Sequence, residues 1–462
     1  MNVLCASEYF PPFAPGGGQW NVLALGRALA ARGHRFQVVT PNYGALAEET
    51  IDGVHVRRFP IASKLAPGQG SVPLRSHLNP AFLIRYGREL CRAGRASRPD
   101  VVLACLPFSI LPSLVAARVL GVPCVVEFRD PGYGCPIATC MVEGPQIPRD
   151  CGQRRLWRHC SGFFIEHYLP GGRGHRFATR LRLAALYAFY QLQLRALRWC
   201  GGALFVSHSL RDIYRNAGQI PLPDGRLGVR HSTFTLGAGA TPPEPASIRR
   251  RYGVEGRRVV LYAGKLSLGK GTYVLAQAAE AVASEVPDAT FLLAGKGVIE
   301  LPKGSADVRG LGVVPRDDMP GLYAIADVVV HPAVWPEPLS QSLLDAGVFG
   351  KPVVASRVGG TPEVVIDGET GILVPPRDAE ALARALSSLL RDESQRARLG
   401  ANAGVSVRSR FSADTTVAAF LQFCRSIGAH EAQQEEGARA TAPRPAASAS
   451  GSGGGSAGVT KS

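Results

Sequence analysis

Features typical of secreted and membrane-spanning proteins are scarce in this sequence. The N-terminus, MNVLCASEYF, has no basic residues and is interrupted by Glu8, so it does not read as a signal peptide. The most apolar stretch, residues 101–126, contains Pro107, Pro112 and Pro123. These prolines break it well short of the ~20 continuous apolar residues that a membrane helix needs. We therefore expect a cytoplasmic protein whose ten cysteines are reduced thiols.

Acidic residues and lysine are also in short supply. The chain has 36 Asp and Glu against 52 Lys and Arg, only seven of them lysine, which gives a net charge of +16. The excess is uneven, because residues 1–240 carry 28 basic and 13 acidic residues, whereas residues 241–462 carry 24 and 23. This asymmetry argues against a uniformly basic, nucleic-acid-binding surface. It favours a first half that faces an anionic membrane or a lipid-phosphate acceptor, at the inner face of the cell membrane.

The 462 residues, 46% of them hydrophobic, are enough for two domains. Short apolar runs alternate with amphipathic stretches of helical length on both sides of residue 240, a pattern typical of parallel sheets covered by helices. We expect strands at 3–6, 36–39, 101–104, 124–127, 203–207, 259–263, 290–294, 328–331 and 353–356. The predicted class is α/β, with domains at 1–238 and 246–425, a hinge at 237–245 and a disordered tail at 429–462.

The second half concentrates charged residues at strand ends. Lys265 and Lys270 flank a Gly-rich turn after the apolar run 259–263, an arrangement suited to binding a diphosphate. Glu337 lies in a Pro-rich loop, and Asp345 follows within a helix predicted to start near Ser340. Carboxylates at these places can accept hydrogen bonds from sugar and ribose hydroxyls, while the helix start favours phosphate. A capped helix with a solvated Asp345 is the alternative.

The order of these motifs resembles the retaining nucleotide-sugar glycosyltransferases of family 4. The resemblance rests on Lys265-x4-Lys270-Gly271, Glu337-x7-Asp345 and the segments GKPVVAS and GGTPEVV that follow. It implies a GT-B fold, in which two Rossmann-like domains face a central cleft, and it implies that the two lysines bind the donor diphosphate. It further implies that Glu337 contacts the donor sugar, that Asp345 holds the ribose, and that the main-chain N–H groups of Leu339 and Ser340 meet the phosphates.

Two residues depart from the family's pattern. Lys265 replaces the usual Arg and loses its bidentate fork. Asp345 replaces the usual Glu and is one methylene shorter, so the ribose must lie closer or be bridged by water. We expect activity to survive both changes because each keeps the charge, and we expect the donor site to need neither a cofactor nor a divalent metal, since lysines and helix starts can neutralise the diphosphate.

The first half supplies the expected acceptor side. Gly16 and Gly17 follow the first strand and allow close approach of the backbone to an anion, although a plain turn explains them as well. Asp130 follows the apolar run 124–127, where parallel sheets place ligand-binding residues. The resemblance places it near a glycan or lipid-linked acceptor, as a positioned acid or base; an ion-pair network with Arg129 and Glu127 is the alternative.

A cysteine-rich insert is expected at about residues 131–175. Four cysteines lie within 26 residues, but their spacing is looser than that of typical zinc sites, so a metal site, a disulfide and free thiols all remain open. They are Cys135, Cys140, Cys151 and Cys160. A basic, amphipathic helix follows, with Leu183, Tyr187, Tyr190, Leu194 and Leu197 at helical spacing. It is predicted to pack on the sheet, with membrane-surface contact as an additional role.

Three functions are compatible with these features. The first is a glycosyltransferase that moves a sugar from a nucleotide-diphosphate sugar to an acceptor with retention, in bacterial polysaccharide or glycolipid synthesis. The others are a nucleotide-sugar epimerase of the same fold and a non-catalytic nucleotide- or carbohydrate-binding scaffold. Transfer to an acceptor distinguishes the first function from both alternatives.

Overall fold

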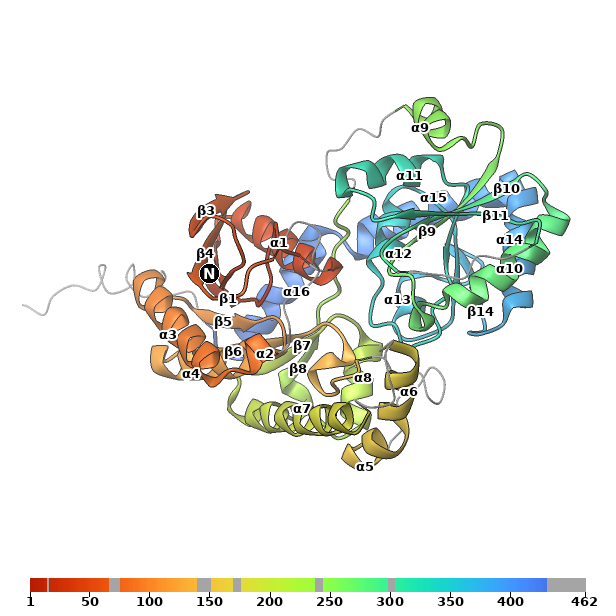
Figure 1. Cartoon of the computed structure of the whole chain (residues 1–462). Coiled ribbons are helices and arrows are strands. Elements are labelled where there is room, and N and C mark those ends of the chain that lie inside the picture. Colours follow the sequence, from red (N-terminus) through yellow and green to blue (C-terminus); the bar gives the residue numbers. More distant parts are fainter. Residues whose placement is uncertain are drawn as a thin grey trace, which may run out of the picture.

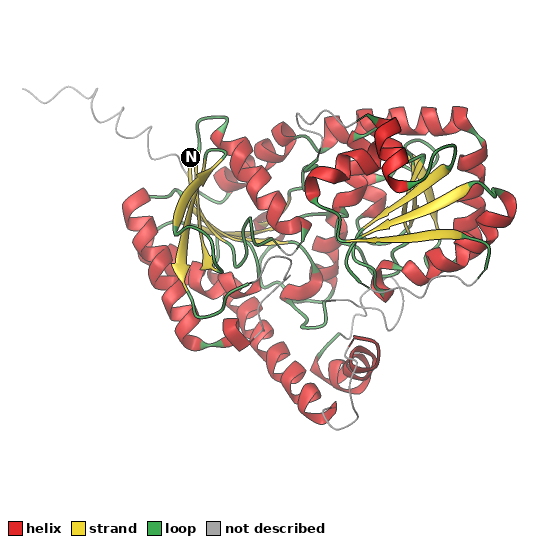
Figure 2. Ribbon diagram, turned by 45° about the horizontal axis from the view of Figure 1, so that its top comes forward, coloured by secondary structure: helices red, strands yellow, loops and turns green. Residues whose placement is uncertain are grey.

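The computed structural model describes residues 1–14, 16–65, 75–138, 151–168, 176–236, 244–297 and 304–429. The predicted hinge falls almost wholly outside these ranges, and so do Cys140 and nearly all of the predicted tail. Within them, the chain forms two sheets in separate lobes, each flanked by helices (Figures 1 and 2). The predicted α/β class with two parallel sheets is confirmed.

The first sheet has the order β3-β4-β2-β1-β5-β6-β7-β8, and all of its neighbouring strands are parallel except β3 and β4. Its strands are β1 (Asn2–Ala6), β2 (Arg35–Asn42), β3 (Glu48–Ile51), β4 (Val54–Pro60), β5 (Val101–Ala104), β6 (Cys124–Phe128), β7 (Gly202–Phe205) and β8 (Leu227–Val229). The central strands are almost entirely apolar because helices cover both of their faces.

Alternation along these strands divides the core of the first lobe between two faces. Leu4 and Ala6 point to one face, and Val3 and Cys5 point to the other. The helices of this lobe are α1 (Gly17–Ala30), α2 (Arg75–Leu78), α3 (Pro80–Ser97), α4 (Ile110–Leu120), α5 (Gln153–Arg155), α6 (Ser161–Tyr168), α7 (Arg176–Ala196) and α8 (His208–Asn216). The predicted basic helix is α7, and its residues Tyr190 and Leu194 join those of α3 and α4 on the Leu4 face, as expected. Leu183 and Tyr187 instead pack in a separate cluster with residues of the cysteine-rich insert.

The second sheet is wholly parallel, with the order β11-β10-β9-β12-β13-β14. Its strands are β9 (Arg258–Ala263), β10 (Ala289–Ala294), β11 (Asp307–Gly312), β12 (Val328–His331), β13 (Val353–Ser356) and β14 (Gly371–Val374). Its helices are α9 (Pro245–Tyr252), α10 (Thr272–Glu285), α11 (Met319–Ile325), α12 (Gln341–Val348), α13 (Thr361–Val364), α14 (Ala379–Arg391) and α15 (Glu393–Arg410). Residues of α10 and α14 pack on one face, and residues of α9, α11 and α12 pack on the other.

The last helix, α16 (Ala413–Ser426), returns to the first lobe. Its residues Val417, Phe420 and Cys424 are buried against α1 and the Val3 face of the first sheet. Figure 1 shows α16 beside α1, in the first lobe. The sequence predicted one continuous second domain over 246–425, but the packing assigns its final helix to the first.

A cleft between the two lobes as the candidate active site

The two lobes meet at a cleft of about 590 Å³. Its walls are the loops that leave the carboxyl ends of β6, β7, β9 and β12 together with the starts of α1 and α12, which is where open α/β sheets bind ligands. The predicted site residues that line it are Gly16, Gly17, Asp130, Lys265, Lys270, Glu337, Leu339 and Ser340. Residues predicted from distant parts of the sequence are therefore brought together, with Asp345 as the exception.

Two helix N-termini face this cleft, one from each lobe. Gly17 at the start of α1 lies so close to α12 that an added Cβ would be 3.3 Å from the Gln341 side chain. Ser340 precedes α12, and no side chain caps its first turn. Neither helix has an acidic residue in its first turn. The main-chain N–H groups and the positive dipole ends of both helix starts thus face one space, which favours an anion there.

Glu337 lies on the floor of the cleft and is buried. Its Oε2 accepts hydrogen bonds from Lys270 Nζ at 2.6 Å and from Trp335 Nε1 at 2.7 Å, and His331 Nε2 is 3.8 Å away. Burial alone would raise the pKa of Glu337, but Lys270 and His331 outweigh it and hold the pKa at about 2. The carboxylate is therefore ionised throughout the physiological range, suited to accepting hydrogen bonds and to stabilising positive charge.

The two lysines differ in their surroundings. Lys270 is half-buried, bonded to Glu337 and 5.3 Å above the Trp335 ring. Lys265 is exposed at the rim, and its main-chain oxygen accepts a hydrogen bond from Tyr262. Gly271 follows Lys270 with a φ of +68°, and a Cβ there would overlap the carbonyl oxygen of Pro332. Glycine therefore allows the Lys270 turn to contact the loop that carries Glu337.

The segment Gly359-Gly360 supports the Glu337 loop from behind. Gly360 N donates to the Glu337 main-chain oxygen at 2.7 Å, and Gly359 has a φ of +51°. A Cβ at Gly359 would overlap the main chain of Glu337. The sequence motif GGTPEVV thus helps to position the carboxylate, a role that the pattern alone did not reveal.

On the opposite wall there is an ion-pair network of the kind expected as the alternative role of Asp130, but Asp130 is not part of it. Glu127 is paired with both Arg129 and Arg230, and all three side chains are buried. Burial opposes ionisation of Glu127, but the two guanidinium groups lower its pKa to about 2. Asp130 stays outside this network, and its Oδ1 accepts a hydrogen bond from Gly132 N at 2.7 Å. Burial raises the pKa of Asp130, which suits a proton-accepting role beside the cleft.

Asp345 is buried away from the cleft, on the second turn of α12. Its Oδ1 accepts hydrogen bonds from the main-chain N–H groups of Thr235 and Leu236 at 3.1 and 3.2 Å, in the segment that joins the lobes. Burial raises its pKa to about 6, although those N–H groups and Arg316 favour the ionised form. The predicted ribose contact stays a prediction, and in this arrangement Asp345 holds the connecting segment.

Several residues of the site had no predicted role. Trp335 and Gln341 line the cleft, and His331 ends β12 below Glu337. The only sequence feature that could have indicated these residues is their position, since each lies within six residues of Glu337. Arg230 gave no such signal, because its partner Glu127 is 103 residues away along the chain.

Cys135 lies near Cys151 and Cys160, and burial raises its pKa to about 12. Cys140 lies outside the described residues, so the predicted metal or disulfide at the cysteine insert stays a prediction. Among the residues that the structure describes, the group with metal-ligand geometry is a different one, formed by His208, His231 and Glu363. None of the described helices is both long enough and apolar enough to cross a membrane.

Both lobes match models of known protein families. Residues 16–221 match a glycosyl transferase 4-like domain, and residues 246–405 match the glycosyl transferases group 1. Among curated proteins, the 2-deoxystreptamine N-acetyl-D-glucosaminyltransferase of Streptomyces fradiae is 27% identical over 433 residues, 90% of this chain and 92% of that protein. The alpha-D-kanosaminyltransferase of Streptomyces kanamyceticus is 27% identical over 241 residues, half of this chain and 62% of that protein.

Solved structures share the arrangement of both lobes. Anabaena HepE in complex with UDP and glucose superposes with a TM-score of 0.62 at 18% identity, covering 92% of this chain and 100% of that one. WaaG, a glycosyltransferase involved in lipopolysaccharide biosynthesis, gives a TM-score of 0.59 at 16% identity, again covering 92% and 100%. At these identities the similarity establishes the fold, which is the predicted GT-B architecture.

Proposed function

The chain belongs to the glycosyltransferases of GT-B fold that the group 1 and 4-like models describe, and we propose that it transfers a sugar from a nucleotide-diphosphate sugar to an acceptor. The single observation that carries this proposal is the convergence of Lys265, Lys270, Glu337 and two helix starts on one cleft between the lobes. HepE, of the same fold, is described in complex with UDP and glucose. No specific observation favours the epimerase or the scaffold.

The donor side of the reaction follows from the chemistry of these groups. Lys265 and the starts of α1 and α12 stabilise the negative charge that develops on the departing diphosphate, so no divalent metal is needed for transfer. Lys270 connects this region to Glu337, whose ionised carboxylate faces the sugar and stabilises positive charge at its anomeric carbon. Retention of configuration is the outcome that the family resemblance implies.

The acceptor approaches from the first lobe. Asp130 lines the cleft opposite Lys270 and is the residue on that wall whose carboxylate is outside the Glu127 network. It positions the acceptor hydroxyl and takes up its proton. Closure of the two lobes around both substrates excludes water and limits hydrolysis of the donor.

The surface of the first lobe fits an acceptor at an anionic membrane. Large apolar side chains are exposed on α3, α4 and α7, and a groove beside α3 is lined by arginines. The exposed residues are Ile84, Val115, Val119, Phe177, Leu181 and Leu192, and the arginines are Arg88, Arg92 and Arg95. Apolar groups that enter the headgroup region and basic groups beside them bind anionic lipid cooperatively. A lipid-linked glycan at such a surface is the acceptor that we propose.

The proposal is tested by measuring both products of transfer, the released nucleotide diphosphate and the glycosylated acceptor. UDP-, GDP- and ADP-sugars are incubated with a crude bacterial glycolipid fraction, and nucleotide diphosphate release and sugar incorporation are measured with and without EDTA. We expect one donor to give equal amounts of both products, an α-linked product from an α-linked donor, and no loss with EDTA. Sugar release or epimerisation that is independent of acceptor would contradict the proposal.

A further inference from the structure

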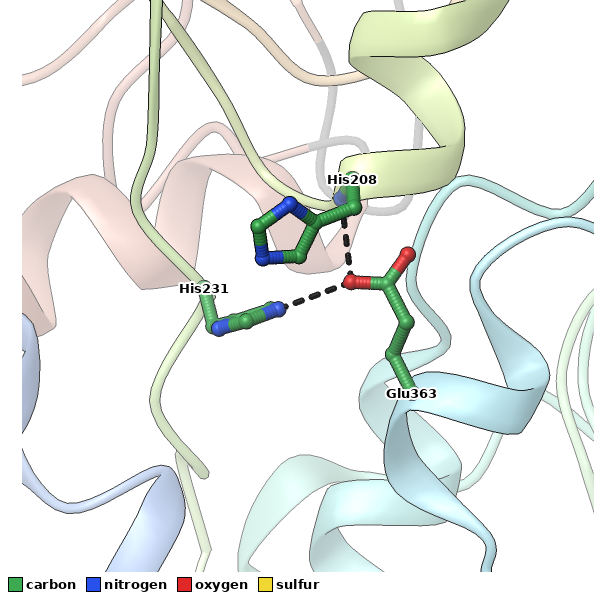
Figure 3. Close-up of side chains that lie close together, drawn as sticks. All are labelled: His208, His231 and Glu363. Atoms are coloured by element: carbon green, nitrogen blue, oxygen red, sulfur yellow. Dashed lines mark hydrogen bonds and ion pairs between the residues drawn. The ribbon is translucent and has the colours of Figure 1, made fainter.

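A second cluster of functional side chains lies where the two lobes touch. His208 begins α8 and His231 follows β8, both in the first lobe, whereas Glu363 belongs to α13 in the second. Figure 3 shows the two imidazole rings and the carboxylate converging on one space. None of the three lines the cleft, and the proposed transfer reaction uses none of them.

The distances suit a single bound ion. One ligand atom from each residue lies within 4.8 Å of the other two, and His231 Nε2 is 2.9 Å from Glu363 Oε2. Two atoms that bind a tetrahedral zinc ion at bond lengths of about 2.0–2.2 Å are separated by about 3.4 Å, so this pair needs a shift of about half an ångström. The ring centroids of His208 and His231 are 5.7 Å apart.

The carboxylate is held in place without the His208 side chain. The main-chain N–H of His208 donates to Glu363 Oε2 at 2.9 Å (Figure 3). The main-chain N–H of Ser209 donates to Glu363 Oε1 at 2.8 Å. The His208 imidazole is exposed, and one of its ring nitrogens lies within 4.8 Å of the ligand atoms of the other two residues. The carboxylate is thus positioned before an ion arrives, which reduces the cost of binding.

The donor set selects the kind of ion. Two imidazoles and one carboxylate form the three-ligand set of open zinc sites, with the fourth position left for water. The start of α8 and Arg410, which donates to the Glu363 main-chain oxygen, disfavour a cation electrostatically. Coordination by nitrogen compensates for this in transition metals, whereas Mg²⁺ and Ca²⁺ prefer oxygen ligands and gain little from imidazole.

We propose that His208, His231 and Glu363 form a binding site for a divalent transition metal of the zinc class that links the two lobes. The ion is coordinated by both lobes at once, so it stabilises their contact. The site also adjoins the cleft, because Val206 lies two residues before His208 and Ser232 directly after His231, and both line the cleft. The proposal concerns binding and does not depend on the transfer reaction.

The test compares zinc binding by the purified full-length chain and two variants. His208→Ala removes one ligand but keeps the main-chain contacts of Glu363, and His55→Ala removes an exposed histidine of β4 as a control. Titration calorimetry with zinc chloride should give one more high-affinity equivalent for the wild type and His55→Ala than for His208→Ala. Zinc bound elsewhere, for example by cysteines, cancels in this comparison. Equal zinc stoichiometry and affinity in all three proteins would overturn the proposal.

A second variant and a second ion distinguish the loss of a zinc ligand from a loss of folding. Glu363→Gln keeps one oxygen that can accept from one of the two α8 N–H groups but loses the charge, and it should weaken zinc binding by at least about 10-fold. Zinc should raise the thermal midpoint of the wild type and not that of His208→Ala, while Mg²⁺ at the same concentration should shift neither. A shift with Mg²⁺ equal to that with zinc would contradict the assigned donor chemistry.

Discussion

At the scale of single residues, Glu337 is the centre of the cleft. Its carboxylate is buried and accepts hydrogen bonds from Lys270 and Trp335, and the His331 ring lies close to it. The sequence predicted both Glu337 and Lys270 from the spacing that resembles the family's, and both line the cleft. It could not show that they bind each other directly, since 67 residues separate them.

Replacement of Glu337 by Gln should abolish most of the transfer activity while the protein stays folded. The amide keeps the hydrogen-bond geometry but loses the charge that faces the sugar, so we expect kcat to fall by about 10²–10⁴. Initial rates and circular dichroism check this. Because the pKa of Glu337 is about 2, the wild-type rate should show no inflection from this residue above about pH 4. Wild-type kcat in the variant would exclude Glu337 from the reaction.

Asp345 gives a prediction about pH and stability. Its pKa is raised from 3.8 to about 6 in the folded protein, so the folded state binds more protons than the unfolded state between these values. The contribution of Asp345 to the free energy of unfolding must therefore decrease as the pH rises from about 4 to 6 and stay constant above. Asp345→Asn removes this pH-dependent contribution. Between pH 4 and 7, the free energy of unfolding of the variant should therefore rise on the order of 2 kcal/mol relative to that of the wild type.

Urea unfolding of both proteins at pH 4, 5, 6 and 7 measures this difference directly, and the other titrating groups cancel. A difference that does not change with pH would show that Asp345 has an ordinary pKa. The KM for the donor, measured in parallel, tests the predicted ribose contact, because a residue that only holds Thr235 and Leu236 should leave donor affinity nearly unchanged.

At the scale of elements, the strands buried on both faces were predictable and the edge strands were not. β12 and β13 match the predicted ranges because unbroken apolar runs such as Val328–His331 have no other stable environment. The edge strands β3 and β11 were missed because charged and glycine residues interrupt them, as exposed edges allow. The short edge strands β8 and β14 were missed as well, and so was β4, an interior strand whose two arginines break its apolar pattern. The Gly359 turn was recognised as a family motif, but its packing against Glu337 needed coordinates.

The Gly359 turn can be tested against a matched glycine. Gly359 and Gly368 both have positive φ, but a Cβ at Gly359 would overlap the Glu337 main chain, whereas nothing lies within 4 Å at Gly368. Gly368→Ala should cost only about 1–2 kcal/mol of stability, the price of the left-handed conformation. Gly359→Ala should cost clearly more and reduce kcat at least 10-fold, measured by urea unfolding and initial rates. Equal losses in both variants would show that the Glu337 loop does not depend on this turn.

At the scale of the whole molecule, the chain crosses between lobes twice. It passes from the first to the second through the segment that Asp345 holds, and it returns through α16. The length and composition predicted two domains, but helical periodicity shows only that a helix has an apolar face and not which lobe covers it. The charge asymmetry coincides with this division, since the basic half builds the lobe that carries most of the large apolar side chains exposed in the described residues.

Because α16 packs on the first lobe, a substitution that weakens this packing should destabilise the first lobe. Phe420 is fully buried against the first sheet, so Phe420→Ala should destabilise the first lobe by about 3–5 kcal/mol. Gln422→Ala on the exposed face of the same helix should change stability by less than about 0.5 kcal/mol. Hydrogen exchange followed by mass spectrometry should show that the amides of β1 and β5 exchange faster in Phe420→Ala than in the wild type. Faster exchange confined to β9–β14 would place α16 with the second lobe.

The most direct test of the central claim, that the cleft binds a nucleotide-diphosphate sugar through its basic wall, is a thermal-shift titration with UDP, GDP, ADP and their sugars. Wild-type protein should be stabilised by one nucleotide series, since a ligand at about 100 times its Kd adds about 2.7 kcal/mol. The double variant Lys265→Ala/Lys270→Ala should fold but show no shift at the same concentrations. If no nucleotide stabilises the wild type, or if the double variant is stabilised equally, the assignment of the donor site is wrong.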